Sequence, residues 1–195
     1  MPSFAMNLLL CDGEAINYGV IFSAAEQLEY QTKLEQEIPW AHEEVVMFGK
    51  RITLSRKMAW VADREQSYLY SGSEKLPLPW TPLLCALKHR CEAISGEVFN
   101  SCLLNFYHDG SEGMGWHADD EPAIVRDSAI ASLSFGAARK FSFKHRISKE
   151  SISTILESGS LLVMKGATQR CWKHALPKSK KVLGPRINLT FRLRC

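Results

Sequence analysis

The sequence lacks any apolar run of the roughly 20 residues that a membrane-spanning helix needs. Its first residues, MPSFAMNLLL, are apolar but include no basic residue and no small-residue cleavage site, so a secretory signal is not expected. The six cysteines form no CxxC pair and, without a secretory signal, are expected to stay reduced. These absences predict a cytoplasmic protein (nuclear if its source is eukaryotic) with no membrane partner.

No internal repeat, low-complexity tract or linker divides the 195 residues, which suit a single domain. Charge, however, is distributed unevenly. Residues 1–130 hold 10 Lys and Arg against 19 Asp and Glu, whereas residues 131–195 hold 14 against 2. The basic part favours a polyanionic partner, with nucleic acid the first choice. The alternative is that the acidic part neutralises it within the fold.

The first half of the chain carries helix and hairpin signals. Residues 23–37 predict an amphipathic helix with a capping box formed by Ser23 and Glu26, and Pro39 ends it. Alternating apolar and polar residues over 45–70 predict a hairpin around Phe48-Gly49-Lys50. The proline-rich segment 76–82 leads into a second helix, over about 82–95.

From residue 97 the chain changes character. Strand-like segments follow one another, punctuated by Gly and Pro, at 98–107, 128–135, 140–146, 152–157, 160–164 and 185–194. Many short strands with turn signals favour a sandwich, barrel or jelly roll. Helices followed by strands predict an α+β chain whose core is all-β.

The segment Gly115-Trp116-His117-Ala118-Asp119-Asp120-Glu121 is the first candidate for chemistry. In an extended segment His117 and Asp119 point to the same side, so an imidazole and a carboxylate become adjacent ligands for a divalent metal. His174 is the candidate third ligand. Two histidines and one carboxylate are the arrangement of non-haem Fe(II) oxygenases. An HxD pair alone is also common by chance.

The last predicted strand offers an anion site. Arg186, Asn188, Thr190 and Arg192 share one face of it, and the alternating apolar residues share the other. Two guanidinium groups and an amide suit a dicarboxylate. Asn105 and Tyr107 share a face of an earlier strand and could bind the same anion. The alternative for the last strand is an edge strand with one solvated face, and the alternative for the earlier strand is an amphipathic strand with its polar side in water.

The combination of NFY, GWHADDE, the distal His174 and RINLTFR resembles the AlkB family of Fe(II)- and 2-oxoglutarate-dependent dioxygenases over roughly residues 45–194. The resemblance implies a double-stranded β-helix, or jelly roll, in one dioxygenase domain spanning 1–195. Residues 1–96 would supply N-terminal helices and a nucleotide-recognition lid with its hairpin, and residues 97–195 the catalytic core.

The resemblance also implies the cofactor site. His117, Asp119 and His174 would bind Fe(II). Five residues would bind 2-oxoglutarate, with Arg192 holding its distal carboxylate: Asn105, Tyr107, Arg186, Asn188 and Arg192. With O2, such an enzyme hydroxylates an N-methyl group on a base and releases formaldehyde, succinate and CO2.

Residues for the substrate are expected in the N-terminal half and after the metal motif. Phe48, at a hairpin tip with Gly49 and Lys50, would enter a base stack while Lys50 and Arg56 hold phosphates; alternatively, Phe48 folds inward as a core residue. The resemblance places Tyr70 on the flipped base and Tyr68 in the pocket wall. Asp120 and Glu121 would accept hydrogen bonds from an exocyclic amine, or simply pair with the basic half. One departure from the family is Ser55 before Arg56, where proline is frequent.

The resemblance therefore implies an enzyme, expected to be monomeric, that repairs N-alkylated DNA bases such as 1-methyladenine and 3-methylcytosine, with duplex DNA as the favoured form. An RNA demethylase or another AlkB-like hydroxylase is the alternative within the same fold. A cupin-like module that binds a metal without turnover is the third possibility, and the complete dicarboxylate clamp argues against it.

Overall fold

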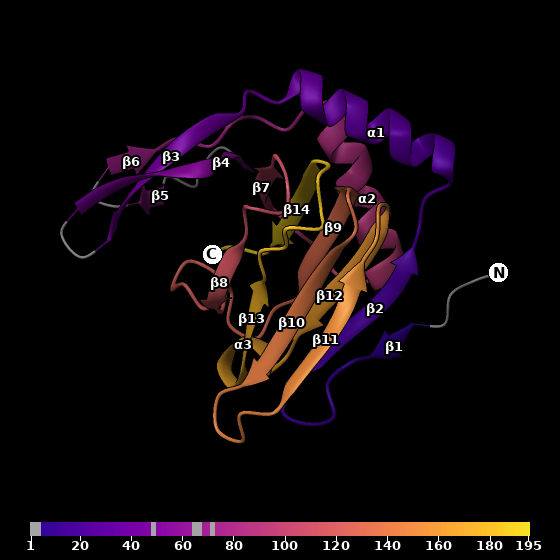
Figure 1. The fold of residues 1–195 in the computed structure, drawn as a ribbon, viewed down its shortest axis with the longest axis vertical. Coiled ribbons are helices and arrows are strands. Elements are labelled where there is room, and N and C mark those ends of the chain that lie inside the picture. The colour runs from indigo at the N-terminus through magenta and orange to yellow at the C-terminus, as the bar shows by residue number, and fades with distance from the viewer. Residues whose placement is uncertain (1–4, 48–49, 64–67, 71–72) are drawn as a thin grey trace.

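The computed structural model describes residues 5–47, 50–63, 68–70 and 73–195. Among these residues, the largest element is an antiparallel sheet (Figure 1). Its strands lie in the order β1 (Met6–Asn7), β2 (Glu14–Val20), β12 (Ser160–Lys165), β9 (Ile130–Gly136), β14 (Arg186–Arg192), β7 (Ser101–Tyr107), β4 (Lys50–Ala62) and β3 (Ala41–Met47).

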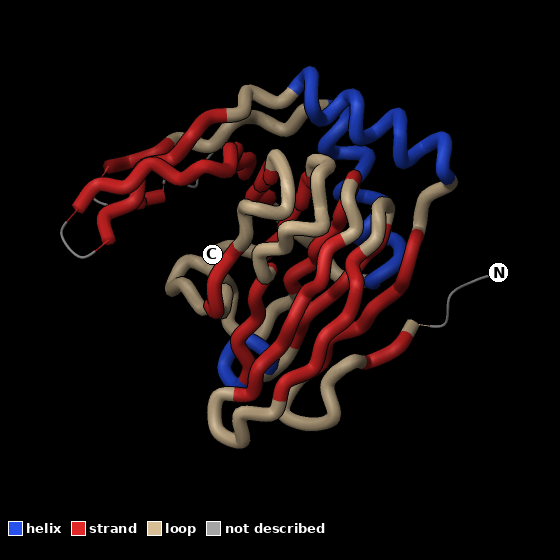
Figure 2. The backbone as a smooth tube through the Cα atoms, in the orientation of Figure 1, coloured by secondary structure: helices blue, strands red, loops and turns tan. Residues whose placement is uncertain are grey.

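A second antiparallel sheet faces the first. Its strand order is β11 (Ser151–Leu156), β10 (Arg139–His145), β13 (Trp172–Leu176) and β8 (Met114–His117). From β7 to β14 the chain passes repeatedly between the two sheets, as Figure 2 shows. Eight strands distributed in this way between two facing sheets are consistent with a jelly-roll core.

Two helices cover the outer face of the large sheet: α1 (Ala24–Glu37) and α2 (Pro82–Ser95) (Figure 1). One apolar core joins them to the sheet, with Leu34 from α1, Leu87 from α2 and Leu104 and Leu189 from the central strands all fully buried. The capping box predicted at Ser23 is present. Within the described residues, no helix is long and apolar enough to cross a membrane.

A second core fills the space between the sheets. Phe143 and Trp172 from the small sheet pack against Ile130 and Leu162 from the large one, and each is at most 1% exposed. The short helix α3 (Thr168–Cys171) closes the connection from β12 to β13. These two cores hold β7, β8, β13 and β14 in fixed positions, and these four strands carry or precede the candidate metal and anion residues.

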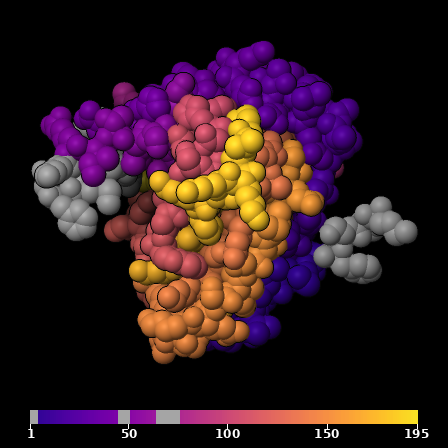
Figure 3. Space-filling view, viewed as in Figure 1, coloured from indigo at the N-terminus to yellow at the C-terminus, as the bar shows by residue number. Residues whose placement is uncertain are grey.

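The hairpin predicted from the alternating pattern is formed by β3 and β4, which pair from Met47↔Lys50 outward. Its turn, Phe48-Gly49, lies outside the described residues. A separate two-stranded sheet, β5 (Tyr68–Tyr70) and β6 (Ser73–Lys75), lies near it (Figure 1). The space-filling view shows this part of the chain, in purple, reaching beyond the body of the two sheets (Figure 3).

The prediction that helices come first and strands afterwards is wrong in one respect: the N-terminal half also supplies sheet. β2 pairs with β12, and β4 pairs with β7, so the large sheet extends on both sides of the jelly-roll strands. β2 contains Gly19, and the pairing register with β12 shifts between Leu161 and Leu162, which indicates a bulge in β2. The alternation of apolar and polar residues along β2 is therefore weak. The strands predicted after residue 97 agree with β7, β9, β10, β11, β12 and β14 to within a few residues.

Candidate functional site

His117, Asp119 and His174 come together at one end of the small sheet. His117 ends β8 and faces His174 of β13 as its direct strand partner, and Asp119 follows in the loop after β8. One nitrogen or oxygen atom from each of the three lies within 4.8 Å of the others. Two imidazole nitrogens and a carboxylate oxygen are the donor set of non-haem Fe(II) oxygenases, so the residues fit that metal.

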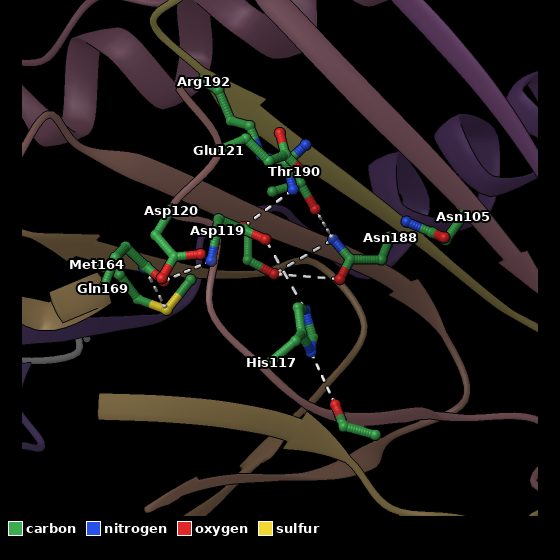
Figure 4. Close-up of polar contacts among 12 residues, drawn as sticks. Asn105, His117, Asp119, Asp120, Glu121, Met164, Gln169, Asn188, Thr190 and Arg192 are labelled. Carbon is green, nitrogen blue, oxygen red and sulfur yellow. Dashed lines mark hydrogen bonds and ion pairs between the residues drawn. The ribbon is translucent and has the colours of Figure 1, made fainter. Parts of the chain in front are cut away.

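Polar contacts fix how His117 and Asp119 present their metal-binding atoms (Figure 4). His117 Nδ1 lies 2.8 Å from the Gly115 carbonyl oxygen, which can only accept, so Nδ1 carries the proton and Nε2 is left with its lone pair. Nε2 lies 3.8 Å from Asp119 Oδ1, while Asp119 Oδ2 pairs with Arg192 Nη2 at 2.9 Å. Asp119 Oδ1, which does not bind Arg192, and His117 Nε2 are therefore both available to bind one metal ion.

Burial and neighbouring charges set the protonation of the triad. Burial alone raises the pKa of the Asp119 carboxyl, but Arg192 and the two histidines outweigh it and hold that pKa at about 2. Burial lowers the pKa of His174 to about 4, although Asp119 partly opposes the shift. At neutral pH the site therefore offers an ionised carboxylate and a neutral buried imidazole, the forms in which both residues bind metals.

The triad opens into a cavity of about 190 Å³ between the sheets. The polar face of β14 forms its floor: Arg186, Asn188, Thr190 and Arg192 all line it. β14 lies between β7 and β9, and Arg186 is only 1% exposed, so the alternative of an edge strand with a solvated face is wrong. Ile187, Leu189 and Phe191 pack into the opposite core as predicted.

One end of the cavity is cationic. The Arg186 guanidinium lies 5.6 Å from the Tyr107 ring centroid, and its Nη2 donates to Ser134 Oγ at 2.9 Å. Arg56 Nε donates to Asn105 Oδ1 at 2.9 Å, which leaves the Asn105 amide N–H groups as donors. No carboxylate among the described residues pairs with Arg186, and its buried Nε has no hydrogen-bond partner there. Burial lowers its pKa to about 10, so it stays charged at neutral pH.

The two arginines of β14 do different things. Arg192 is already paired with Asp119, beside the metal ligands, whereas Arg186 lies at the cationic end with Tyr107 and Asn105. This geometry differs from the expectation that Arg192 holds the far carboxylate of a dicarboxylate. Arg56 was expected to hold a phosphate beside the hairpin, but its bond to Asn105 places its side chain at this end of the cavity.

The residues predicted to bind substrate are more scattered. Glu121 lines the cavity, with Arg194 Nη1 at 3.9 Å, whereas Asp120 lies outside it and pairs with Arg146 at 2.9 Å. Both acids therefore contact the basic half, as the alternative reading held. Lys50 begins β4, and Tyr68 and Tyr70 bound β5, but Phe48 and Gly49 lie outside the described residues. The binding roles of these residues remain predictions.

Sequence reasoning missed Trp60 and Arg194, which also line the cavity. Trp60 follows Arg56 and Met58 at every second position of β4, and Arg194 extends the alternation that includes Arg192. The period-two pattern could therefore have found both. The Arg194 guanidinium lies 5.3 Å from the Trp60 ring centroid.

Comparisons with known proteins agree with this geometry. A family model described as the 2OG-Fe(II) oxygenase superfamily matches residues 16–192. The DNA oxidative demethylase ALKBH2 of Homo sapiens is 39% identical over 192 residues, covering 93% of this chain and 74% of that protein. The alpha-ketoglutarate-dependent dioxygenase alkB homolog 3 of Homo sapiens is 38% identical over 170 residues, covering 82% and 59%. The solved structure of OsALKBH1 shares the fold, with a TM-score of 0.64 at 19% identity, covering 94% of this chain and 99% of that one.

Proposed function

Because the chain belongs to the 2OG-Fe(II) oxygenase superfamily, we propose that it oxidatively demethylates N-alkylated DNA bases, such as 1-methyladenine and 3-methylcytosine. The products are the repaired base, formaldehyde, succinate and CO2. One observation carries the proposal: the His117, Asp119 and His174 cluster opens into the same cavity as Arg186, a buried arginine that pairs with no acid among the described residues. A metal-binding module without turnover has no need of the second feature.

In this assignment His117, Asp119 and His174 hold Fe(II), which with 2-oxoglutarate and O2 supplies the oxidation of the N-methyl group. The protein's own contribution is placement. Arg192 holds one oxygen of Asp119 and so directs the other toward His117. Many of the residues that line the cavity are buried, and burial strengthens electrostatic interactions among them.

Arg186 is our assignment for the partner of the distal carboxylate of 2-oxoglutarate. It has a buried charge with no acidic partner among the described residues, and its fork can bind a carboxylate with two hydrogen bonds. Tyr107 and Asn105 line the same cavity and offer a hydroxyl and an amide as further donors, and Asn188 lies between the two arginines of β14. Arg192, which is paired with Asp119, lies at the metal end of the same cavity.

DNA as the substrate is supported by the names of the relatives and by the charge of the small sheet. Lys140, Lys144 and Lys173 are exposed on β10 and β13, and none forms an ion pair with a described residue. Five other cations of the basic half pair with acids of residues 1–130, so neutralisation is only partial. Free lysines near the metal strands suit a phosphate backbone.

Base recognition is assigned to the open end of the cavity. Glu121, which lines the cavity, would accept a hydrogen bond from an exocyclic amine. Tyr70 would stack on the extruded base, and Tyr68 would line the pocket wall. A preference for duplex DNA rests on the β3–β4 hairpin, whose turn contains Phe48, with Gly49 and Lys50 beside it. We also infer that residues 1–96 supply the N-terminal helices and the nucleotide-recognition lid, that residues 97–195 form the catalytic core, and that the protein acts as a monomer.

The test is formaldehyde release from matched oligonucleotides that carry one 1-methyladenine, with Fe(II) and 2-oxoglutarate supplied. Single-stranded DNA, duplex DNA and single-stranded RNA of one sequence are compared at equal concentration. We expect release from DNA that requires both cofactors and exceeds release from RNA. Faster release from RNA would favour the RNA demethylase, and binding of Fe(II) and 2-oxoglutarate with no release from any substrate would contradict the proposal.

A further inference from the structure

Gln169 of α3 connects the two segments that carry the metal ligands. Its Oε1 accepts a hydrogen bond from the backbone N–H of Asp119, with 3.0 Å between the two atoms. The same short helix leads directly into β13, which holds His174. The Gln169 side chain therefore connects the loop that carries Asp119 to the segment that carries His174. Figure 4 shows its contact with Asp119.

The chemistry of its neighbours fixes the orientation of the Gln169 amide. The Nε2 group donates to Met164 Sδ at 3.6 Å, and Met164 is buried at 2% exposure. With the amide reversed, Nε2 would face the Asp119 N–H and two donors would oppose each other. The acceptor oxygen is therefore directed at Asp119, and the thioether accepts from the other side.

Asp119 needs such support because it lies outside the strands, where no sheet ladder holds its backbone. Two side chains fix it from opposite ends. Arg192 binds Oδ2 of the carboxylate, and Gln169 binds the backbone N–H. Together they set the position of the main chain and the direction of Oδ1 toward His117.

A second link between the loop and α3 lies nearer the surface. Arg146 Nη2 donates to Asp120 Oδ2 at 2.9 Å and to the Gln169 carbonyl oxygen at 3.1 Å. The Arg146 and Asp120 side chains are 34% and 56% exposed, and exposed ion pairs contribute little. The contact of the Gln169 side chain is the one that reaches the ligand residue itself.

We propose that Gln169 is a positioning residue for the metal centre, because its side chain holds Asp119 in the geometry that binds Fe(II). The inference rests on the proposed function, because it takes Asp119 as a ligand. Partners that orient metal ligands typically cost 10- to 100-fold in metal affinity when removed. Gln169→Leu, which keeps the approximate size but removes the acceptor, should therefore weaken metal binding by roughly that factor.

The experiment measures the Kd for Mn(II) from the electron paramagnetic resonance signal of the free ion, using the full chain without 2-oxoglutarate. Gln169→Glu keeps an acceptor oxygen and should retain most of the affinity. Arg170→Ala is the matched control: it changes the next residue of α3, whose side chain pairs with Asp127 at the surface and not with Asp119. Its Kd should stay close to wild type.

Thermal melting of the metal-free variants separates positioning from folding. A purely structural role would lower the melting temperature of Gln169→Leu and leave the Kd of the folded protein unchanged, which would overturn the proposal. An equal loss in Arg170→Ala would also overturn it. If Gln169→Leu does not fold, Gln169→Ala replaces it, and equal affinities of the alanine and glutamate variants would contradict the inference. Wild-type Mn(II) binding by His174→Ala would instead show that the proposed metal site is wrong.

Discussion

Replacing each of the two β14 arginines by lysine should affect two different ligands. Arg186→Lys keeps the positive charge at the cationic end of the cavity but loses the planar fork that binds a carboxylate through two parallel hydrogen bonds. Arg192→Lys keeps a charge that can still pair with Asp119. We therefore expect the first change to weaken 2-oxoglutarate binding and the second to act mainly on the metal.

The expected size follows from the contacts of Arg186. No acid among the described residues pairs with it, so 2-oxoglutarate would supply its charged partner. A hydrogen bond to a charged group contributes about 1.5–3 kcal/mol. At 1.4 kcal/mol per factor of ten, losing one such bond raises the Kd by roughly 10- to 100-fold. For Arg192→Lys the Kd for 2-oxoglutarate should change by no more than about threefold, because its guanidinium is already paired with Asp119.

The assay is calorimetric titration of 2-oxoglutarate into the Mn(II)-loaded protein in the absence of oxygen, with saturating metal for every variant. Melting curves of the metal-free proteins confirm that each variant is folded. A larger loss of 2-oxoglutarate affinity in Arg192→Lys than in Arg186→Lys would refute the reasoning and restore Arg192 as the partner of the distal carboxylate.

Three further outcomes are expected. Tyr107→Phe should raise the Kd for 2-oxoglutarate about 10-fold with little loss of stability, since its ring stays in the apolar core; an unchanged Kd would remove the hydroxyl from the site. In the metal-free protein, His174 takes up a proton near pH 6.5 when unfolded but only near pH 4 when folded, so stability falls by about 3 kcal/mol as pH drops through this window. Urea unfolding at several pH values should show that His174→Phe flattens this decline, and an unaltered curve would contradict the burial argument. Phe48→Ala should slow repair of methylated duplex roughly 10- to 100-fold and spare single strands, as formaldehyde release from the two forms can test; equal losses on both would exclude a wedge.

Much of the core could be read from the sequence because the alternation in the central strands reflects burial on two faces. In β14, arginine and asparagine face one side and leucine and phenylalanine the other, and the structure puts both sides in the interior. The same pattern, however, cannot tell which arginine meets which partner. That depended on the loop after β8, which returns Asp119 to within 2.9 Å of Arg192.

The N-terminal strands were harder to predict. β2 reads EAINYGV, with little alternation, and it joins the sheet only because β12 lies beside it in space. Gln169 was missed for a related reason, since a glutamine in a four-residue helix has no sequence pattern that marks it. Its contact with Asp119 joins residues that are distant in the chain, and only the fold brings them together.

The most direct test of the account is a crystal structure of the protein with Mn(II) and 2-oxoglutarate, grown without oxygen and measured at the manganese absorption edge. The account predicts one anomalous peak bound by His117, Asp119 and His174, with the distal carboxylate of 2-oxoglutarate on Arg186. A peak at the other cluster of possible ligands, Cys11, Asp12 and His145, with none at the first, would contradict it.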